Sequence, residues 1–145
     1  MSRTVTPELT AMMTPIEAVL KPLRFRRGSV IHNGKWLSAD WSSDHTFVMA
    51  TVEPGDRWGE LYVARRSDEQ PWEANVPIRR VLAAMRRPTV RVPDRVTADI
   101  DVLEAWSTGM ATALASIVDV LRGDALDVLD GLIASHRSVE RQPDR

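Results

Sequence analysis

The sequence predicts an α+β fold: an N-terminal helix, a four-stranded antiparallel meander, and three C-terminal helices packed on one sheet face. Proline-marked helix starts come first along the chain, alternating apolar runs bounded by turn residues follow, and apolar residues at helical spacing fill the last third. A length of 145 residues suits one domain. We place an N-terminal extension at residues 1–13, the domain at residues 14–137 and a polar tail at residues 138–145.

Two helix-start signals, Thr6-Pro7 and Thr14-Pro15, stand near the N-terminus. Threonine suits the N-cap position and proline suits the first helical position. The second signal adds Glu17 three residues after the threonine, which is the spacing of a capping box. We therefore expect a short helix over Pro15–Lys21, ended by Pro22 because proline breaks a helix.

The segment Leu23–Trp41 predicts a β-hairpin, because Asn33-Gly34 is a strong signal for a two-residue turn. Such a turn places His32 opposite Lys35. A β-bulge at Gly28 restores the alternation of the residues before it, since one extra residue flips the faces. One face of the hairpin then carries Val30, Leu37, Ala39 and Trp41.

Two further strands are expected at Thr46–Glu53 and Glu60–Arg65, separated by the loop Pro54–Gly59. Both strands have apolar residues at successive positions rather than at alternate ones only. This pattern predicts that both faces of the sheet are partly covered at these strands.

A long helix begins at a cap formed by Thr97 or Asp99 and runs to Arg122, because apolar residues recur there at steps of three or four. Gly123 ends this helix in the position where glycine is favoured. Asp124 then caps a last helix.

Four arginines lie in or just after a short helix predicted over Val76–Arg86, and an extended connector follows over Pro88–Thr97. We call them the arginine stripe: Arg79, Arg80, Arg86 and Arg87. Each member of the first pair lies seven residues before its counterpart, or nearly two helical turns, so the four side chains share one face. The stripe is either a surface for phosphates or an acidic partner, or a solvated face that contacts the acidic C-terminal helices.

Five tryptophans are present in the chain. Trp41 and Trp106 have apolar neighbours at structural spacing, so we expect both in the core. The other three, which lie beside turns or loops, either anchor an interface or seal an open end of the sheet: Trp36, Trp58 and Trp72.

Several common activities have no motif in this chain. It has no cysteine, no glycine-rich phosphate loop and no nucleophile elbow. A metal or acid–base cluster would need the nearest candidates to converge: His32, Asp40, Asp44 and His45. The expected hairpin separates its two ends by roughly 20 Å, so we expect no metal, no cofactor and no catalytic residues.

No apolar run approaches the roughly 20 residues that span a membrane. The N-terminal residues also lack the apolar segment of a signal peptide. We therefore expect a cytoplasmic protein that does not bind membranes.

The passage Ile16–Trp41 reads IEAVLKPLRFRRGSVIHNGKWLSADW. Its helix ending in Leu-Lys-Pro-Leu, its Phe-Arg-Arg-Gly strand start and the following meander resemble small bacterial α+β domains of unknown function, some linked with toxin-immunity loci. A four-stranded meander with flanking helices is also similar in outline to type III secretion chaperone-like domains. These resemblances imply binding to another protein and supply no catalytic residues.

We therefore expect a non-enzymatic bacterial interaction protein, immunity-like or chaperone-like. It would bind a partner protein through the sheet face, the loop tryptophans and the arginine stripe. One alternative is a small-ligand-binding or enzymatic domain, with a pocket between sheet and helices near Trp36, Asp40 and Tyr62. A further alternative is a nucleic-acid binder that uses the arginine stripe.

Overall fold

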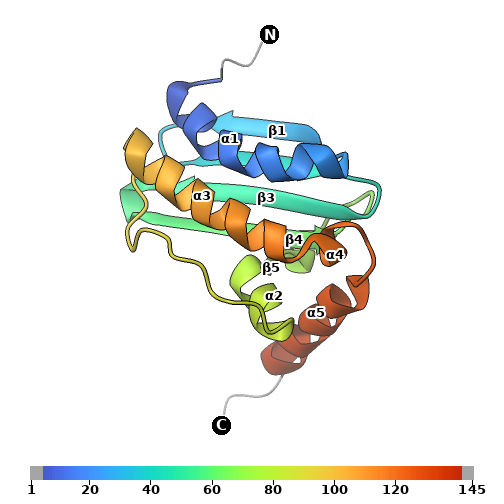
Figure 1. Ribbon diagram of the computed structural model, residues 1–145. Helices are drawn as coiled ribbons and strands as arrows, with labels where there is room; N and C mark the ends of the chain where they lie inside the picture. The colour runs from blue at the N-terminus through green and yellow to red at the C-terminus, as the bar shows by residue number, and fades with distance from the viewer. Residues whose placement is uncertain (1–4, 142–145) are drawn as a thin grey trace.

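The computed structural model describes the backbone of residues 5–141 and the side chains of residues 5–135. Figure 1 shows an α+β fold in which a helix precedes a five-stranded sheet and further helices follow it. The strands are β1 (Arg26–His32), β2 (Leu37–Ser42), β3 (Thr46–Glu53), β4 (Trp58–Arg65) and β5 (Val76–Pro77). The α-helices are α1 (Pro7–Leu20), α2 (Ile78–Ala84), α3 (Ile100–Ser116), α4 (Val118–Leu121) and α5 (Leu126–Arg141).

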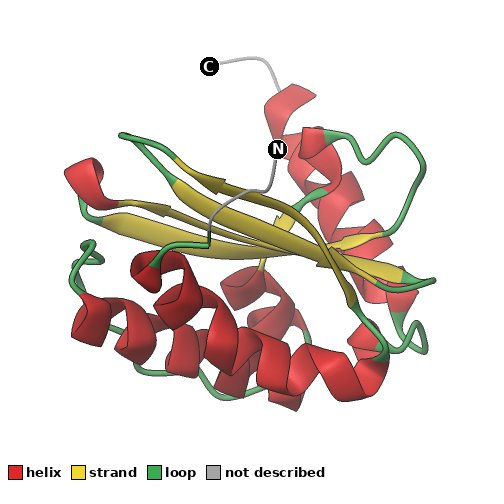
Figure 2. Cartoon of the chain, turned by 90° about the horizontal axis from the view of Figure 1, so that it is seen from above, coloured by secondary structure: helices red, strands yellow, loops and turns green. Residues whose placement is uncertain are grey.

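The sheet is an antiparallel meander with the strand order β1-β2-β3-β4-β5. Helices α1 and α3 lie side by side and cover one face, the inner face; Figure 2 shows both beneath the sheet. Helix α5 lies at the edge formed by β4 and β5. The opposite face, the outer face, carries alternate strand residues: Ile31, Ser38, Asp40, Phe47, Met49, Thr51, Glu53, Trp58, Glu60 and Tyr62.

The core lies between the inner face and the two helices α1 and α3. Its strand residues, all nearly inaccessible, are Leu37, Ala39, Trp41, Val48, Ala50, Val52, Leu61 and Val63. Trp41 and Trp106 are both buried, as the sequence predicted. The Trp106 ring lies against the backbone of Gly59, where an added Cβ would be 3.1 Å from the ring. A larger residue at Gly59 would therefore push α3 away from the sheet.

The N-terminal helix α1 spans Pro7–Leu20 and is longer than the helix expected over Pro15–Lys21. Thr6 is its N-cap and accepts the Leu9 N–H at 3.3 Å, so the first start signal is confirmed. The expected capping box at Thr14 is wrong, because Thr14 lies inside the helix and its hydroxyl donates to the Thr10 carbonyl at 2.8 Å.

Residues 7–13, which the sequence analysis placed in an extension, form the first half of α1. Their side chains Leu9, Met12 and Met13 are buried. Pro15 is tolerated within the helix because packing against α3 along its length offsets the lost hydrogen bond. Residues 1–4 of that extension and 142–145 of the expected tail lie outside the described residues, whereas residues 138–141 belong to α5.

The β1–β2 hairpin has a four-residue connection rather than the predicted two-residue turn. His32 pairs with Leu37, and the Asn33 side-chain oxygen accepts the N–H groups of Lys35 at 2.8 Å and Trp36 at 3.0 Å. The asparagine thus closes the loop through its side chain, which the Asn-Gly signal alone does not reveal. The register differs by two residues, and a shift of two leaves every side chain on its predicted face.

The expected bulge at Gly28 is confirmed, because the pairing of β1 with β2 shifts between Arg27 and Val30. The Asp40 carboxylate fills the space beside Gly28 and accepts the Ser29 N–H at 3.1 Å. A side chain at position 28 would overlap this carboxylate. The bulge is therefore built from a glycine and an acidic partner on the neighbouring strand.

The fifth strand lies where the sequence analysis expected the start of a helix over Val76–Arg86. Val76 and Pro77 pair with Val63 and Tyr62, and α2 begins only at Ile78. The extended conformation has a local cause, since the residue before a proline is disfavoured in a helix. Pro77 also suits an edge strand, where its missing N–H removes no internal pairing.

The long helix expected to reach Arg122 is interrupted at Ile117, which has φ −120° and ψ 33° and separates α3 from α4. Asp99 is the N-cap of α3, and its side chain accepts the Asp101 N–H at 2.9 Å. Gly123 has φ 88°, so its predicted helix-ending position is confirmed. The described residues after the sheet thus contain four α-helices rather than the three expected.

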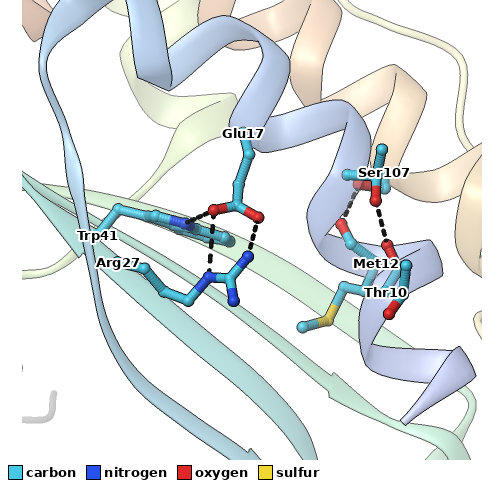
Figure 3. A network of polar contacts seen from close by, with 7 residues as sticks. Thr10, Met12, Glu17, Arg27, Trp41 and Ser107 are labelled. Atoms are coloured by element: carbon cyan, nitrogen blue, oxygen red, sulfur yellow. Dashed lines mark hydrogen bonds and ion pairs between the residues drawn. The ribbon is translucent and has the colours of Figure 1, made fainter. Parts of the chain in front are cut away.

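Two polar contacts join α1 to its neighbours, and Figure 3 shows both. The half-buried Glu17 carboxylate accepts the Arg27 Nε at 3.1 Å, a second Arg27 nitrogen, and the Trp41 Nε1 at 3.3 Å. The buried Ser107 hydroxyl of α3 donates to the Met12 carbonyl. Hydrogen bonds are directional and apolar contacts are not, so these contacts fix the position of α1 relative to β1, β2 and α3.

Candidate interaction surface

The outer face is the open side of the sheet. Among the described residues, no helix covers this face over β1, β2 and β3 in Figure 2. Its centre is small and polar, with the Ser38 and Thr51 hydroxyls 3.4 Å apart on paired strands. Larger apolar side chains surround this centre, among them Ile31, which is 45% exposed on β1. The face therefore combines a small polar centre, in which Thr51 is buried and Ser38 half-buried, with more exposed apolar side chains around it.

Two of the three loop tryptophans lie at one end of the outer face. Trp36 precedes β2 and Trp58 begins β4, and both are 40% exposed. Trp58 pairs with Glu53 at the end of β3. We call this end of the sheet the tryptophan end; its residues are Trp36, Glu53 and Trp58. Both side chains are well exposed, whereas the core residues Leu37 and Val52 at this end of the sheet are buried. The two tryptophans are therefore not core residues.

The third tryptophan lies beside β4. Trp72 belongs to a short 3₁₀ helix, Trp72–Ala74, and its ring meets the Tyr62 ring edge-on with centroids 5.2 Å apart. Tyr62 is buried beneath it, whereas Trp72 is 61% exposed. One face of the indole is therefore held in place while the rest remains accessible, which is how a rigid aromatic anchor is presented.

Carboxylates accompany these aromatic rings. Burial raises the pKa of the Asp40 carboxyl, and the Ser29 N–H opposes the shift. Burial also raises the pKa of the Glu60 carboxyl, opposed chiefly by the Arg79 guanidinium. The pKa of the Tyr62 hydroxyl is raised by burial and by the charge of Glu60. These carboxylates are short of cationic partners, so a cation arriving from outside would stabilise their charged form.

The arginine stripe does not form one surface. Helix α2 ends at Ala84, and Arg86, with φ 55°, lies in the left-handed position of a helix-ending turn. In this turn the Arg87 N–H donates to the Leu82 carbonyl at 2.8 Å and the Arg86 N–H donates to the Ala83 carbonyl at 3.1 Å. Two helical turns are thus not available to align the pairs, because a Schellman motif redirects the chain.

Three of the four arginine side chains have different neighbours among the described residues. Arg79 is exposed and its charge acts on Glu60. Arg80 donates to the Leu132 carbonyl of α5 at 3.3 Å. Arg87 lies 3.7 Å from Asp119 of α4. Only Arg79 is therefore associated with the outer face.

His32 lies at the opposite end of the sheet from Asp44 and His45, as the hairpin geometry predicted. His32 lies on β1, where its Nδ1 is 2.6 Å from the Thr6 hydroxyl. Asp44 and His45 belong to the β2–β3 turn at the other end of the sheet. Within the described part of the chain, no three histidine or acidic side chains are placed to hold one metal ion.

The residues named for an alternative pocket lie on the far side of the sheet from α1 and α3. Asp40 and Tyr62 are outer-face residues, and Trp36 stands in the loop beside them. The inner face at the same strands is filled by the core. The sheet therefore separates these three residues from the helical layer. Sequence alternation places Asp40 and Tyr62 on their strands but does not reveal that they share a face with Glu53 and Glu60.

Comparisons with protein-family models, with curated proteins and with solved structures gave no match. No helix in the described residues is both long enough and apolar enough to cross a membrane.

Proposed function

We propose that this chain is a protein-interaction domain that binds a partner through the outer face, without catalysing a reaction. The observation that carries the proposal is an open sheet face with exposed aromatic rings and acidic groups, lying over a complete core. The bacterial immunity-like or chaperone-like character belongs to the same proposal and is supported by the resemblance of residues 16–41.

The aromatic rings would supply most of the binding energy. Trp58 and Trp72 expose much of their indoles while their backbones belong to ordered elements. Tryptophan is among the residues most enriched at binding hot spots, because one rigid ring buries a large area at a small entropic cost. Exposed apolar rings gathered on one face are also typical of interaction surfaces.

The acidic groups define the chemistry of the partner. The outer face carries three acidic residues: Asp40, Glu53 and Glu60. The charge of Arg79, at the border of this face, acts on Glu60. A partner segment that presents lysine or arginine between apolar side chains would match this pattern. Its cations would pair with carboxylates that are already partly desolvated, so less hydration is lost on binding than at a fully solvated acid.

The free strand edge is less suited to binding than the face. β1 forms one edge of the sheet, and the bulge at Gly28 interrupts its row of backbone groups. Arg26 and Arg27 precede the bulge. Bulges and charged residues are the features that discourage pairing with an added strand. We therefore assign the partner to the outer face rather than to the β1 edge.

The test compares the chain with a Trp58→Ala/Trp72→Ala double variant. Each would be immobilised and used to capture proteins from its native host, and a captured partner would then be purified and titrated by calorimetry. We expect the double variant to weaken binding by about 100-fold, because each tryptophan truncation at a hot spot costs roughly 1–2 kcal/mol. The matched control is Ile100→Ala, which truncates a side chain exposed at the start of α3.

Hydrogen exchange of the complex gives a second readout. Protection should increase at β2, β3, β4 and the Trp72–Ala74 segment, and remain unchanged along α3. A partner that binds the double variant as tightly as the original chain, or that protects only the helical layer, contradicts the proposal. A Glu60→Gln variant that leaves affinity unchanged contradicts the assigned basic partner but not the docking face.

A further inference from the structure

A cavity of about 440 Å³ lies at the end of the sheet opposite the tryptophan end. It is bordered by the start of β1, the β2–β3 turn, the end of β4 and the end of α4. We call it the arginine cavity, since its charged and imidazole side chains are Arg24, Arg26, Asp44, His45, Arg66 and Arg122. Four sequence segments separated by up to about 100 residues thus contribute to one small volume.

The backbone around the cavity is held by specific contacts. The Ser43 hydroxyl oxygen accepts the N–H groups of His45 and Thr46, each at 3.2 Å, and closes the β2–β3 turn. The buried Thr46 hydroxyl donates to the Leu121 carbonyl at 2.8 Å, which ties the turn to α4. The Arg66 N–H donates to the His45 carbonyl at 2.9 Å. The walls are therefore positioned before any ligand arrives.

Two residues with left-handed backbones shape the entrance. Arg24 has φ 65° immediately after a 3₁₀ turn, a conformation that costs energy for a residue with a side chain. Gly123 has φ 88°, and an added Cβ would lie 2.8 Å from the His45 ring. The imidazole thus packs directly against the turn that follows Arg122. Both conformations close helix-ending turns, in which the Phe25 N–H donates to the Leu20 carbonyl at 3.2 Å and the Asp124 N–H donates to the Asp119 carbonyl at 2.9 Å.

Positive charge in the cavity is not balanced by the protein itself. The ion pairs among the described residues involve Arg27, Arg65 and Arg87 and none of the cavity arginines. Asp44 is the single carboxylate among the lining residues, against four guanidinium groups. Four guanidinium groups around one carboxylate give this cavity a positive potential, which attracts an anion.

We propose that the arginine cavity binds a phosphate monoester in its dianionic form. Guanidinium forks match phosphate oxygens in pairs, and two charges on the ligand balance the excess better than one carboxylate does. The Ser42 hydroxyl adds a donor, and Leu23 and Leu121 provide an apolar wall for a carbon skeleton. The cavity is a single compact site rather than a row of phosphate contacts, so the ligand is a small molecule or one phosphorylated side chain, and not a nucleic-acid strand.

The experiment titrates the full chain with three probes at low ionic strength: inorganic phosphate, adenosine monophosphate, and a short peptide containing phosphoserine. Binding would be followed by calorimetry and by amide shifts at residues 42–46. We expect Arg66→Gln and Arg122→Gln each to raise the dissociation constant by about tenfold, which is the order of one charge-assisted contact. All four cavity arginines are exposed at the surface, so these variants are expected to fold.

The control is Arg95→Gln, an exposed arginine in the connector before α3 and outside the cavity. It should change the dissociation constant by less than about twofold, which separates a local site from the general charge of the chain. Tighter binding of the nucleotide identifies a free small molecule as the source of the phosphate, and tighter binding of the peptide identifies a phosphorylated protein. Failure of all three probes to bind, or equal losses in Arg95→Gln and Arg66→Gln, overturns the proposal. The outcome is independent of the outer face, whose residues are not altered.

Discussion

Along β3 and β4, neighbouring residues of one strand have opposite surroundings. The inner residues Val48, Ala50 and Leu61 are fully buried under α1 and α3. The outer residues are less uniformly covered: Met49 is half-buried, whereas Tyr62, its partner across the two strands, is buried beneath the exposed Trp72. The inner face therefore supplies most of the core, whereas the outer face keeps partly exposed side chains that can serve recognition.

The two ends of the sheet differ as sharply as its two faces. The tryptophan end carries exposed indoles around Glu53, and the arginine cavity at the other end gathers four cations around Asp44. The arginine cavity also adjoins the core, because its lining residue Leu121 is buried in the core and Leu23 packs against it. We expect substitutions in the core to change the free energy of unfolding more than substitutions at the outer face do.

The largest effect should follow from truncating the inner face. Leu61 is fully buried beneath α1 and α3, so Leu61→Ala leaves a cavity in the core. We expect this variant to lower the free energy of unfolding by roughly 2–5 kcal/mol. Met49→Ala, on the paired strand but on the outer face, should cost about 1 kcal/mol because this side chain is only half-buried. Urea denaturation of both variants checks the contrast, and equal losses would show that the outer face also carries the fold.

The turn behind the arginine cavity gives the next effect. Gly123→Ala imposes a side chain at φ 88° and against the His45 ring, so we expect a loss of roughly 1–3 kcal/mol. The matched control is Gly131→Ala in α5, where no atom lies within 4 Å of the new Cβ. That change should instead stabilise the chain by about 0.5–1 kcal/mol, since alanine favours a helix. Thermal unfolding distinguishes the two signs.

The hydrogen bonds of Glu17 with Arg27 and Trp41 connect α1 to the sheet. Glu17→Gln keeps the shape but removes the charge that two donors share, and we expect a loss of about 1–2 kcal/mol. Asp130→Asn, which removes the acid from an exposed pair with Arg65, should have a clearly smaller effect because solvent screens that pair. Chemical denaturation at low and high salt provides the measurement; an equal response of the two variants would contradict a special role for Glu17.

The smallest effect concerns the pKa of Glu60, which is raised above its ordinary value of 4.5 by burial. Between 4.5 and the raised value, the folded chain binds more protons at this group than the unfolded chain does. The contribution of Glu60 to stability therefore falls as the pH rises through that window. Glu60→Gln should therefore raise the free energy of unfolding at pH 7 slightly, by less than about 0.5 kcal/mol after allowance for solvent screening.

The gain in Glu60→Gln should shrink as the pH is lowered toward about 4, where the native carboxyl is also neutral. Glu69→Gln, in the exposed loop after β4, serves as the control and should show no such trend. Melting temperatures measured from pH 4 to pH 8 decide the point. A variant less stable than the original chain at pH 7 would mean that the pairing with Arg79 outweighs burial.

Local sequence signals located most elements because they act over a few residues. The range Thr46–Glu53 was predicted with the bounds it has in the structure, and the bulge at Gly28 and the helix end at Gly123 were also confirmed. Errors arose where a local signal was outweighed by packing. Pro15 marks a helix start in isolation, but burial of Leu9 and the residues around it extends α1 back to Pro7.

The candidate sites show the same limit more strongly. Tryptophans beside turns were found from sequence, since turn chemistry and ring size are both local properties. The arginine stripe was expected as one surface but is divided by the turn at Arg86, whose left-handed backbone has no marker in the sequence. The arginine cavity was not foreseen, although Arg24, Arg66 and Arg122 are each visible in the chain.

The sequence by itself therefore determined the α+β class, the faces of the hairpin and which tryptophans remain outside the core. These follow from the spacing of apolar residues, and spacing acts through backbone geometry that every residue shares. Tertiary structure alone decided which distant charges meet. Arg24 and Arg122 become neighbours only after β2 and β3 have paired and α4 has docked on Thr46, so their meeting depends on contacts between segments nearly 100 residues apart.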